Sequence, residues 1–192
     1  MSQSATGQPA SVSDHLATLV GTVGGLLIAR YVGWTMVLIP LAFIGLFGWL
    51  GRKWLRPAAQ PLLEAFAVQA GLLGWMLVGT AVLIAGAVDS AALTQQLPSL
   101  IETGLDVVWL LGGLVWLVIR PGTGAVLCLG LYQVFKLAGN LFSLSEVALN
   151  TVEHKALIVH LLLAVLALVF LIQGWLRLRR LRAAEAATIA GG

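Results

Sequence analysis

Two long segments without charge constrain the fold of this chain most. Residues 65–88 and 156–176 contain no Lys, Arg, Asp or Glu, and each reaches the roughly 20 residues that a helix needs to cross a bilayer core. Only 10% of the 192 residues are charged, whereas a soluble domain carries roughly 25%. So few charges cannot cover a water-exposed surface. The sequence therefore predicts a helical integral membrane protein.

Three weaker segments complete the predicted bundle. Residues 31–51 form one further apolar span. Residues 105–119 and 124–142 form two shorter ones, which are separated by Arg120-Pro121-Gly122-Thr123. Proline and glycine together favour a turn, so a tight helical hairpin is predicted over 105–142. The fold class is an all-α polytopic transmembrane bundle with about five spans, or six if residues 16–29 also cross.

The chain is expected to form a single transmembrane helical domain over residues 16–182. Residues 1–15 are polar and contain no Lys or Arg, which argues against a cleaved signal peptide and favours a disordered tail. Residues 183–192 are predicted to be a disordered C-terminal tail. Gly21 and Gly25 have the spacing of a close helix contact, although such pairs are common in glycine-rich sequence.

The distribution of basic residues predicts the orientation. Cytoplasmic loops hold an excess of Lys and Arg. Three segments hold most of them: Arg52 to Arg56, Arg120, and Arg177 to Arg182. The alternate loops differ: residues 89–104 contain two acidic residues and no Lys or Arg, and residues 143–155 contain two acidic residues and a single Lys. We therefore expect a bacterial-type inner (plasma) membrane protein with a cytoplasmic C-terminus.

Charged and polar residues inside the hairpin are the most informative candidates for a site. Counted from a turn near residue 122, Asp106 and Lys136 differ in depth by roughly 3 Å at 1.5 Å per residue. Intramembrane charges usually pair with one another, so the sequence suggests an Asp106–Lys136 ion pair.

Gln133, Lys136 and Asn140 are spaced i, i+3, i+7 and share one helical face. Together with Asp106 they form the predicted intramembrane polar cluster. One interpretation is the wall of a polar path, and the other is hydrogen bonding between helices. A path needs matching polar groups on other helices, which offer only Gln69, Thr80, His160 and Gln173. The structural interpretation is therefore favoured at this point.

His160 is the one weak candidate for a ligand inside a span. His154 and His160 lie on opposed faces of a helix, so a bis-histidine haem would need His15 with one of them. The single cysteine, Cys128, is expected to pack in the bundle. Glu146, Glu153 and His154 share a predicted outer loop, for which solvation is the simpler interpretation. No cofactor or metal is predicted, and bound lipid is expected.

Gly71, Trp75 and Gly79 are spaced i, i+4, i+8 and form a stripe on one helical face. We interpret this stripe as a contact with another helix and not as a platform for a ligand.

No catalytic motif is present in the sequence, so an enzyme is disfavoured, and the basic residues do not form a nucleic-acid-binding surface. The leading functional hypothesis is a non-enzymatic accessory or scaffold subunit that acts through helix contacts, with other membrane protein subunits or copies of itself as partners. The alternative is a transporter or channel component with a path along Lys136, Gln133, Asn140 and Asp106. A haem-bearing redox anchor is the second alternative.

Overall fold

The structure is a computed structural model that describes residues 30–86 and 90–191. In this part of the chain, five helices are long and apolar enough to cross a bilayer. They are α2 (Trp34–Trp54), α3 (Leu63–Gly86), α4 (Ser90–Ile119), α5 (Thr123–Glu146) and α6 (Val152–Gly191). A short 3-10 helix, η1 (Pro57–Leu62), leads directly into α3. The predicted all-α bundle of about five spans is confirmed. The predictions for residues 1–15 and 16–29 lie outside the described residues.

Local sequence explains where the helices begin and end. Gly33 has a φ of 108°, a conformation that favours glycine, and it precedes the first residue of α2. At the other end of α2, Leu55 and Arg56 are extended, as expected for residues that approach Pro57. The Thr151 hydroxyl accepts a hydrogen bond of 3.1 Å from the backbone N–H of His154, which caps the start of α6.

The predicted hairpin is present, with α4 and α5 joined by residues 120–122. The two helices approach closely at Gly113, where an added Cβ would lie 2.5 Å from Leu129 Cδ2. The predicted span 105–119 is too short, however, because α4 begins at Ser90. Most of the predicted loop 89–104 is helical, since Pro98 and Glu102 lie within α4. The predicted span began at Leu105, although the polar residues before it continue the same helix.

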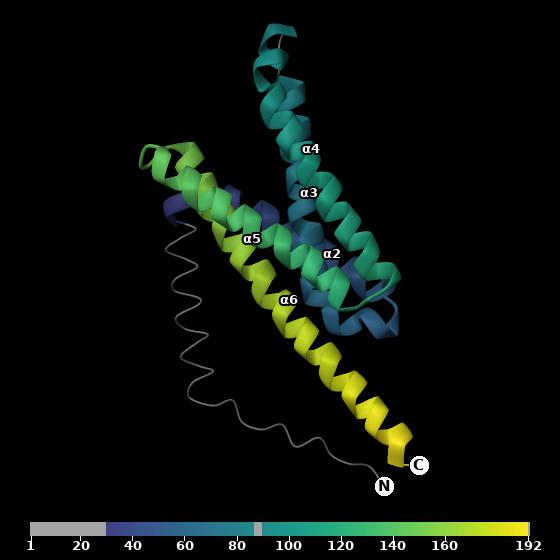
Figure 1. Ribbon diagram of the computed structural model, residues 1–192. Helices are drawn as coiled ribbons and strands as arrows, with labels where there is room; N and C mark the ends of the chain where they lie inside the picture. The colour runs from purple at the N-terminus through teal and green to yellow at the C-terminus, as the bar shows by residue number, and fades with distance from the viewer. Residues whose placement is uncertain (1–29, 87–89, 192) are drawn as a thin grey trace.

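Four of the five helices form two diverging pairs. Figure 1 shows α3 running beside α4, and α5 beside α6, with the pairs separating as they leave the α4–α5 turn. Helix α2 packs mainly against α3, which also contacts α6. Below the point of divergence, buried side chains join α3, α4, α5 and α6 into one apolar core. Its fully buried members include Leu62, Leu110, Leu117, Leu129 and Leu171.

Glycines permit close contacts between helices elsewhere in the bundle as well. At Gly71 an added Cβ would lie 2.6 Å from Ile44 Cγ1 and 2.9 Å from the Ile44 backbone nitrogen. At Gly174 it would lie 2.9 Å from the Pro61 carbonyl oxygen. The predicted stripe of Gly71, Trp75 and Gly79 is therefore only partly a helix contact. A Cβ at Gly79 would meet no atom within 4 Å.

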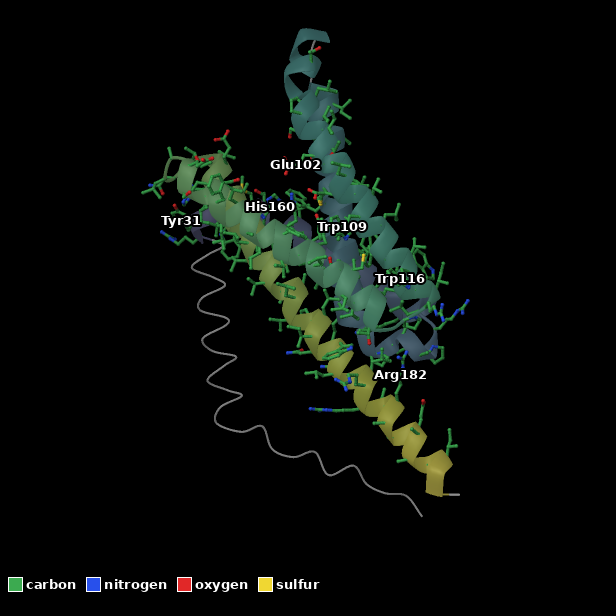
Figure 2. The ribbon with its side chains drawn as sticks, viewed as in Figure 1. Tyr31, Glu102, Trp109, Trp116, His160 and Arg182 are labelled. Carbon is green, nitrogen blue, oxygen red and sulfur yellow. The ribbon has the colours of Figure 1, made fainter. Side chains whose placement is uncertain are left out.

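Three basic segments meet at one end of the bundle. Arg182 Nη2 donates to the Pro121 carbonyl oxygen at 2.8 Å, which links α6 to the α4–α5 turn. Arg177 Nη1 lies 2.6 Å from Glu64 Oε2 near the start of α3. Figure 2 places Arg182 at this end and Tyr31 at the opposite end. The grouping fits membrane helices that each have a basic end on the same side.

The C-terminal segment differs from its prediction. Residues 183–192 were expected to be disordered, but α6 continues as a helix to Gly191. Four alanines and Glu185 follow Arg182 within six residues, and these residues have high intrinsic helix propensity. They add turns to a helix that is already formed, so they do not bear the cost of nucleation.

We expect Gly71→Ala to destabilise the protein, because its methyl group would overlap the Ile44 backbone. Overpacking of this kind costs about 1–3 kcal/mol. Gly79→Ala is the matched control, since its methyl group meets no atom within 4 Å and alanine is the better helix former. Thermal unfolding in detergent should give a lower Tm for Gly71→Ala only. Equal Tm values for the two variants would contradict the close α2–α3 contact.

Candidate functional site

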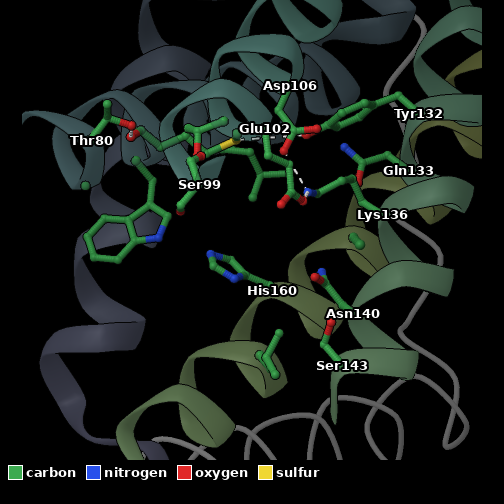
Figure 3. A pocket seen from close by; sticks show the side chains of 17 residues that line it. Thr80, Ser99, Glu102, Asp106, Tyr132, Gln133, Lys136, Asn140, Ser143 and His160 are labelled. Atoms are coloured by element: carbon green, nitrogen blue, oxygen red, sulfur yellow. Dashed lines mark hydrogen bonds and ion pairs between the residues drawn. The ribbon is translucent and has the colours of Figure 1, made fainter. Parts of the chain in front are cut away.

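A polar cavity of about 500 Å³ lies where the two helix pairs diverge. Its wall includes side chains from α3, α4, α5 and α6. All four residues of the predicted polar cluster line it, and so does His160. Figure 3 shows Thr80 and Ser99 on one side of the cavity and His160, Asn140 and Ser143 on the other. A cavity of this size is within the range of small-molecule sites.

An ion pair stands at the centre of the cavity wall. Lys136 Nζ lies 2.6 Å from Asp106 Oδ2, which is the pairing suggested by the depth of the two residues in the hairpin. The same ammonium lies 3.4 Å from Glu102 Oε1. The Asp106 side chain is 15% exposed and the Glu102 side chain is 75% exposed. Lys136 thus binds a sheltered carboxylate and leaves the outer one largely accessible.

Tyr132 and Gln133 line the cavity and contact buried side chains behind its wall. Gln133 Nε2 donates to Gln69 Oε1 at 2.6 Å, and both amides are almost fully buried. The buried Tyr132 hydroxyl contacts Met76 Sδ at 3.9 Å. The Trp109 and Tyr132 rings pack with their centroids 5.9 Å apart. Gln133 therefore forms a hydrogen bond between helices, as the structural interpretation predicted. Lys136 and Asn140 on the same face of α5 line the cavity.

Three polar side chains at the cavity have unused hydrogen-bonding groups. Asn140, Ser143 and His160 line the cavity, and within the described part of the chain their side chains form no hydrogen bond with protein. In Figure 3 the His160 ring points toward the open space below Glu102 and Lys136. Polar groups without protein partners in a cavity can bind water or a polar solute.

The cavity opens at the end of the bundle opposite the basic segments. Asp106 lies fourteen residues before Arg120, which is about 20 Å along a helix. Ser99 and Glu102, which lie further along α4, are exposed. Toward the α4–α5 turn, the buried leucines of the core close the space. The cavity thus has an exposed mouth beside Ser99 and Glu102, and the leucine core lies between the cavity and the α4–α5 turn.

Three lining residues of α4 were not predicted as site residues: Ser99, Glu102 and Thr103. Ser99, Glu102, Thr103 and Asp106 follow an i, i+3, i+4, i+7 pattern and all line the cavity, so they share one face of α4. The pattern was not recognised because residues before 105 were assigned to a loop. Ser143 lies one residue beyond the predicted span 124–142. Trp75 and Gly79 also line the cavity, although the sequence favoured a helix contact for them.

The other candidates do not form a second site. Among residues 30–86 and 90–191, no three His, Cys, Asp or Glu side chains group as metal ligands would. His154 is buried in the first turn of α6, not in a solvated loop. Cys128 is partly buried near Gly113, and its backbone carbonyl accepts a hydrogen bond from Trp109 Nε1. Gln173 is exposed and does not line the cavity.

Comparison with known proteins gives no match to a family model, to a curated protein or to a solved structure. The chemistry of the cavity is therefore the basis for the functional proposal.

We expect Lys136→Met to destabilise the protein by about 2 kcal/mol, because it leaves the sheltered Asp106 carboxylate without its cation. The double variant Asp106→Asn with Lys136→Met removes both charges and should be closer to the wild type. Arg180→Gln, a change at an exposed residue, is the control and should stay within about 0.5 kcal/mol. Unfolding in detergent measures all three, and a double variant that is less stable than Lys136→Met would contradict the pairing.

Proposed function

We propose that this multi-span membrane protein binds a small, positively charged solute in its polar cavity, as a component of a solute-passage system. The observation that supports the proposal is the convergence of polar side chains from four helices on one cavity. A polar path needs matching polar groups on helices other than α5. Thr80 on α3, His160 on α6 and a polar face of α4 meet that requirement.

The formal charge of the cavity favours a cation. Glu102 and Asp106 supply two carboxylates, and Lys136 supplies one ammonium. The sum is −1 with His160 neutral. The exposed Glu102 carboxylate lies at the mouth, where a second cation can approach it. The Trp75 ring is a further part of the wall, and aromatic faces attract cations, quaternary ammonium groups in particular.

Passage across the membrane needs a change at the inner end of the cavity. The Gln69–Gln133 hydrogen bond and the leucines below it separate the cavity from the basic end of the bundle. A second conformation or a second subunit is therefore part of the proposal. The five spans are few for a complete transporter, so an oligomer is expected.

The basic residues indicate which membrane face the cavity meets. The three basic segments lie together at the closed end, and such segments are normally cytoplasmic. We therefore place the mouth on the outer side of a bacterial-type inner membrane, with the C-terminus in the cytoplasm.

The two other hypotheses have less support. The exposed apolar side chains of α4, such as Leu105 and Val108, suit lipid as well as a partner helix, so they do not favour an accessory subunit over a solute-binding protein. For a haem anchor, His160 lines the cavity but His154 does not. His15 lies outside the described residues. Co-purification from the native membrane and the colour of the protein test these two hypotheses.

The proposal is tested with choline and its uncharged isostere 3,3-dimethyl-1-butanol. Choline should raise the Tm of the purified full-length protein in a concentration-dependent way, and the isostere should raise it less. Glu102→Gln should weaken choline binding about fivefold, because an exposed ion pair contributes up to about 1 kcal/mol. Binding of the isostere should be unchanged by this substitution.

A cavity-filling variant provides the steric test. Gly79→Leu should abolish choline binding, since the added side chain enters the cavity and its Cβ meets no atom within 4 Å. Gly139→Leu is the matched control, because Gly139 is equally open but does not line the cavity. Equal choline binding by both variants, or equal binding of choline and its isostere, would refute the proposal.

The orientation is tested by labelling single cysteines in intact cells. Cys128 is the only native cysteine, so Cys128→Ser provides the background. With a membrane-impermeant maleimide, Ser99→Cys should react in intact cells, and Ala183→Cys should react only after permeabilisation. The opposite pattern would invert the proposed topology.

A further inference from the structure

A second cavity, of about 340 Å³, lies between α2, α3 and α6 near the basic end of the bundle. Gly45 and Gly48 of α2, Ala67 of α3 and Phe170 of α6 give it a largely apolar wall. Arg52 and Glu64 lie at one end of it. It shares no lining residue with the polar cavity.

The small residues create the apolar part of this groove. A Cβ added at Gly45 would meet no atom within 4 Å, and one added at Gly48 would lie 3.5 Å from Ala67 Cβ. Further along α3, helices α2 and α3 are in direct contact, because a Cβ added at Gly71 would lie 2.9 Å from the Ile44 backbone nitrogen. The groove therefore runs along α2 and ends at a tight helix contact.

The charged end of the groove has an excess of positive charge. The Glu64 carboxylate is already paired with Arg177 at 2.6 Å. Lys53 lies over the Trp49 ring, 3.8 Å from its centroid. Arg52 is exposed and forms no ion pair with any residue that the structure describes. Arg52 thus lines the end of the groove, and Lys53 and Arg177 contact the lining residues Trp49 and Glu64. Three cations and one carboxylate lie at or beside this end.

We propose that this groove binds one anionic phospholipid. An acyl chain lies along Gly45 and Gly48, and the headgroup phosphate pairs with Arg52. Basic pockets between transmembrane helices are a known form of anionic headgroup recognition, and Trp49 is the type of aromatic residue that lies at headgroup depth. The inference goes beyond the proposed function and is independent of the polar cavity. Bound lipid is expected from the sequence, and the proposal gives that lipid a location and a negatively charged headgroup.

The test is lipid retention by the purified full-length protein. The protein is equilibrated in mixed micelles with equal amounts of phosphatidylglycerol and phosphatidylcholine, and native mass spectrometry counts the retained lipids. We expect one phosphatidylglycerol to be retained preferentially. Arg52→Gln should reduce this preference about fivefold, since one basic residue near the surface contributes about 1 kcal/mol. Gly45→Leu should remove the retained lipid altogether, because leucine occupies the groove.

Two matched variants separate the groove from general effects. Gly139→Leu adds the same side chain at another open helical position, and Arg180→Gln removes another exposed arginine. Both should retain the lipid as the wild type does. If Gly45→Leu does not elute as folded protein, Gly45→Val replaces it, since the first added carbon meets open space.

Three results would overturn the proposal. The first is wild-type retention by both Gly45→Leu and Arg52→Gln. The second is equal retention of phosphatidylcholine by the wild type. The third is complete displacement of the lipid by inorganic phosphate at an equal concentration, which would mean that Arg52 binds a free phosphate and that the apolar groove contributes nothing.

Discussion

A charged side chain inside a bilayer needs a partner of opposite charge. This requirement determines how α4 and α5 are oriented around the polar cavity. Lys136 and Asp106 lie on different helices of the hairpin, 2.6 Å apart at their charged atoms. Neither can rotate toward lipid without exposing a charge to hydrocarbon. The pair thus sets the rotation of both α4 and α5 about their axes. The polar residues that share those faces, Ser99 and Thr103 on α4 and Asn140 and Ser143 on α5, then point into the same space.

The sequence was sufficient for features that depend on a single helix or a single turn. The lengths of the apolar segments predicted the spans, and counting residues from the Arg120–Thr123 turn brought Asp106 level with Lys136. It was not sufficient where helices distant in the chain meet. The contribution of α3 and α6 to the cavity, through Thr80 and His160, depends on how the helices pack, and residue spacing does not contain that information. Length rules also fail where a helix continues beyond the hydrocarbon core, as α4 and α6 do.

The two cavities differ in chemistry because different helices enclose them. Leu72 of α3 lines the polar cavity, and Val68, one turn earlier, lines the groove. Both belong to a buried apolar cluster that includes Leu163 and Ala167 of α6. At the polar cavity, the helix pairs diverge around charged and amide side chains. At the other cavity, glycines let α2 approach α3 almost completely, and only a narrow apolar groove is left. The leucine core thus closes the inner end of the polar recess.

Helix α6 has 40 residues and therefore a length of about 60 Å, twice the thickness of a hydrocarbon core. The same rod forms part of the cavity wall at His160 and ends near Gly191, about 46 Å away along its axis. Rigid geometry then converts small rotations into large displacements. A tilt of about 5° at the cavity moves the far end of the rod by about 4 Å. Any tilt of α6 that widened the recess would therefore act first on the contacts that hold the same helix further along, at Gly174 and Arg182.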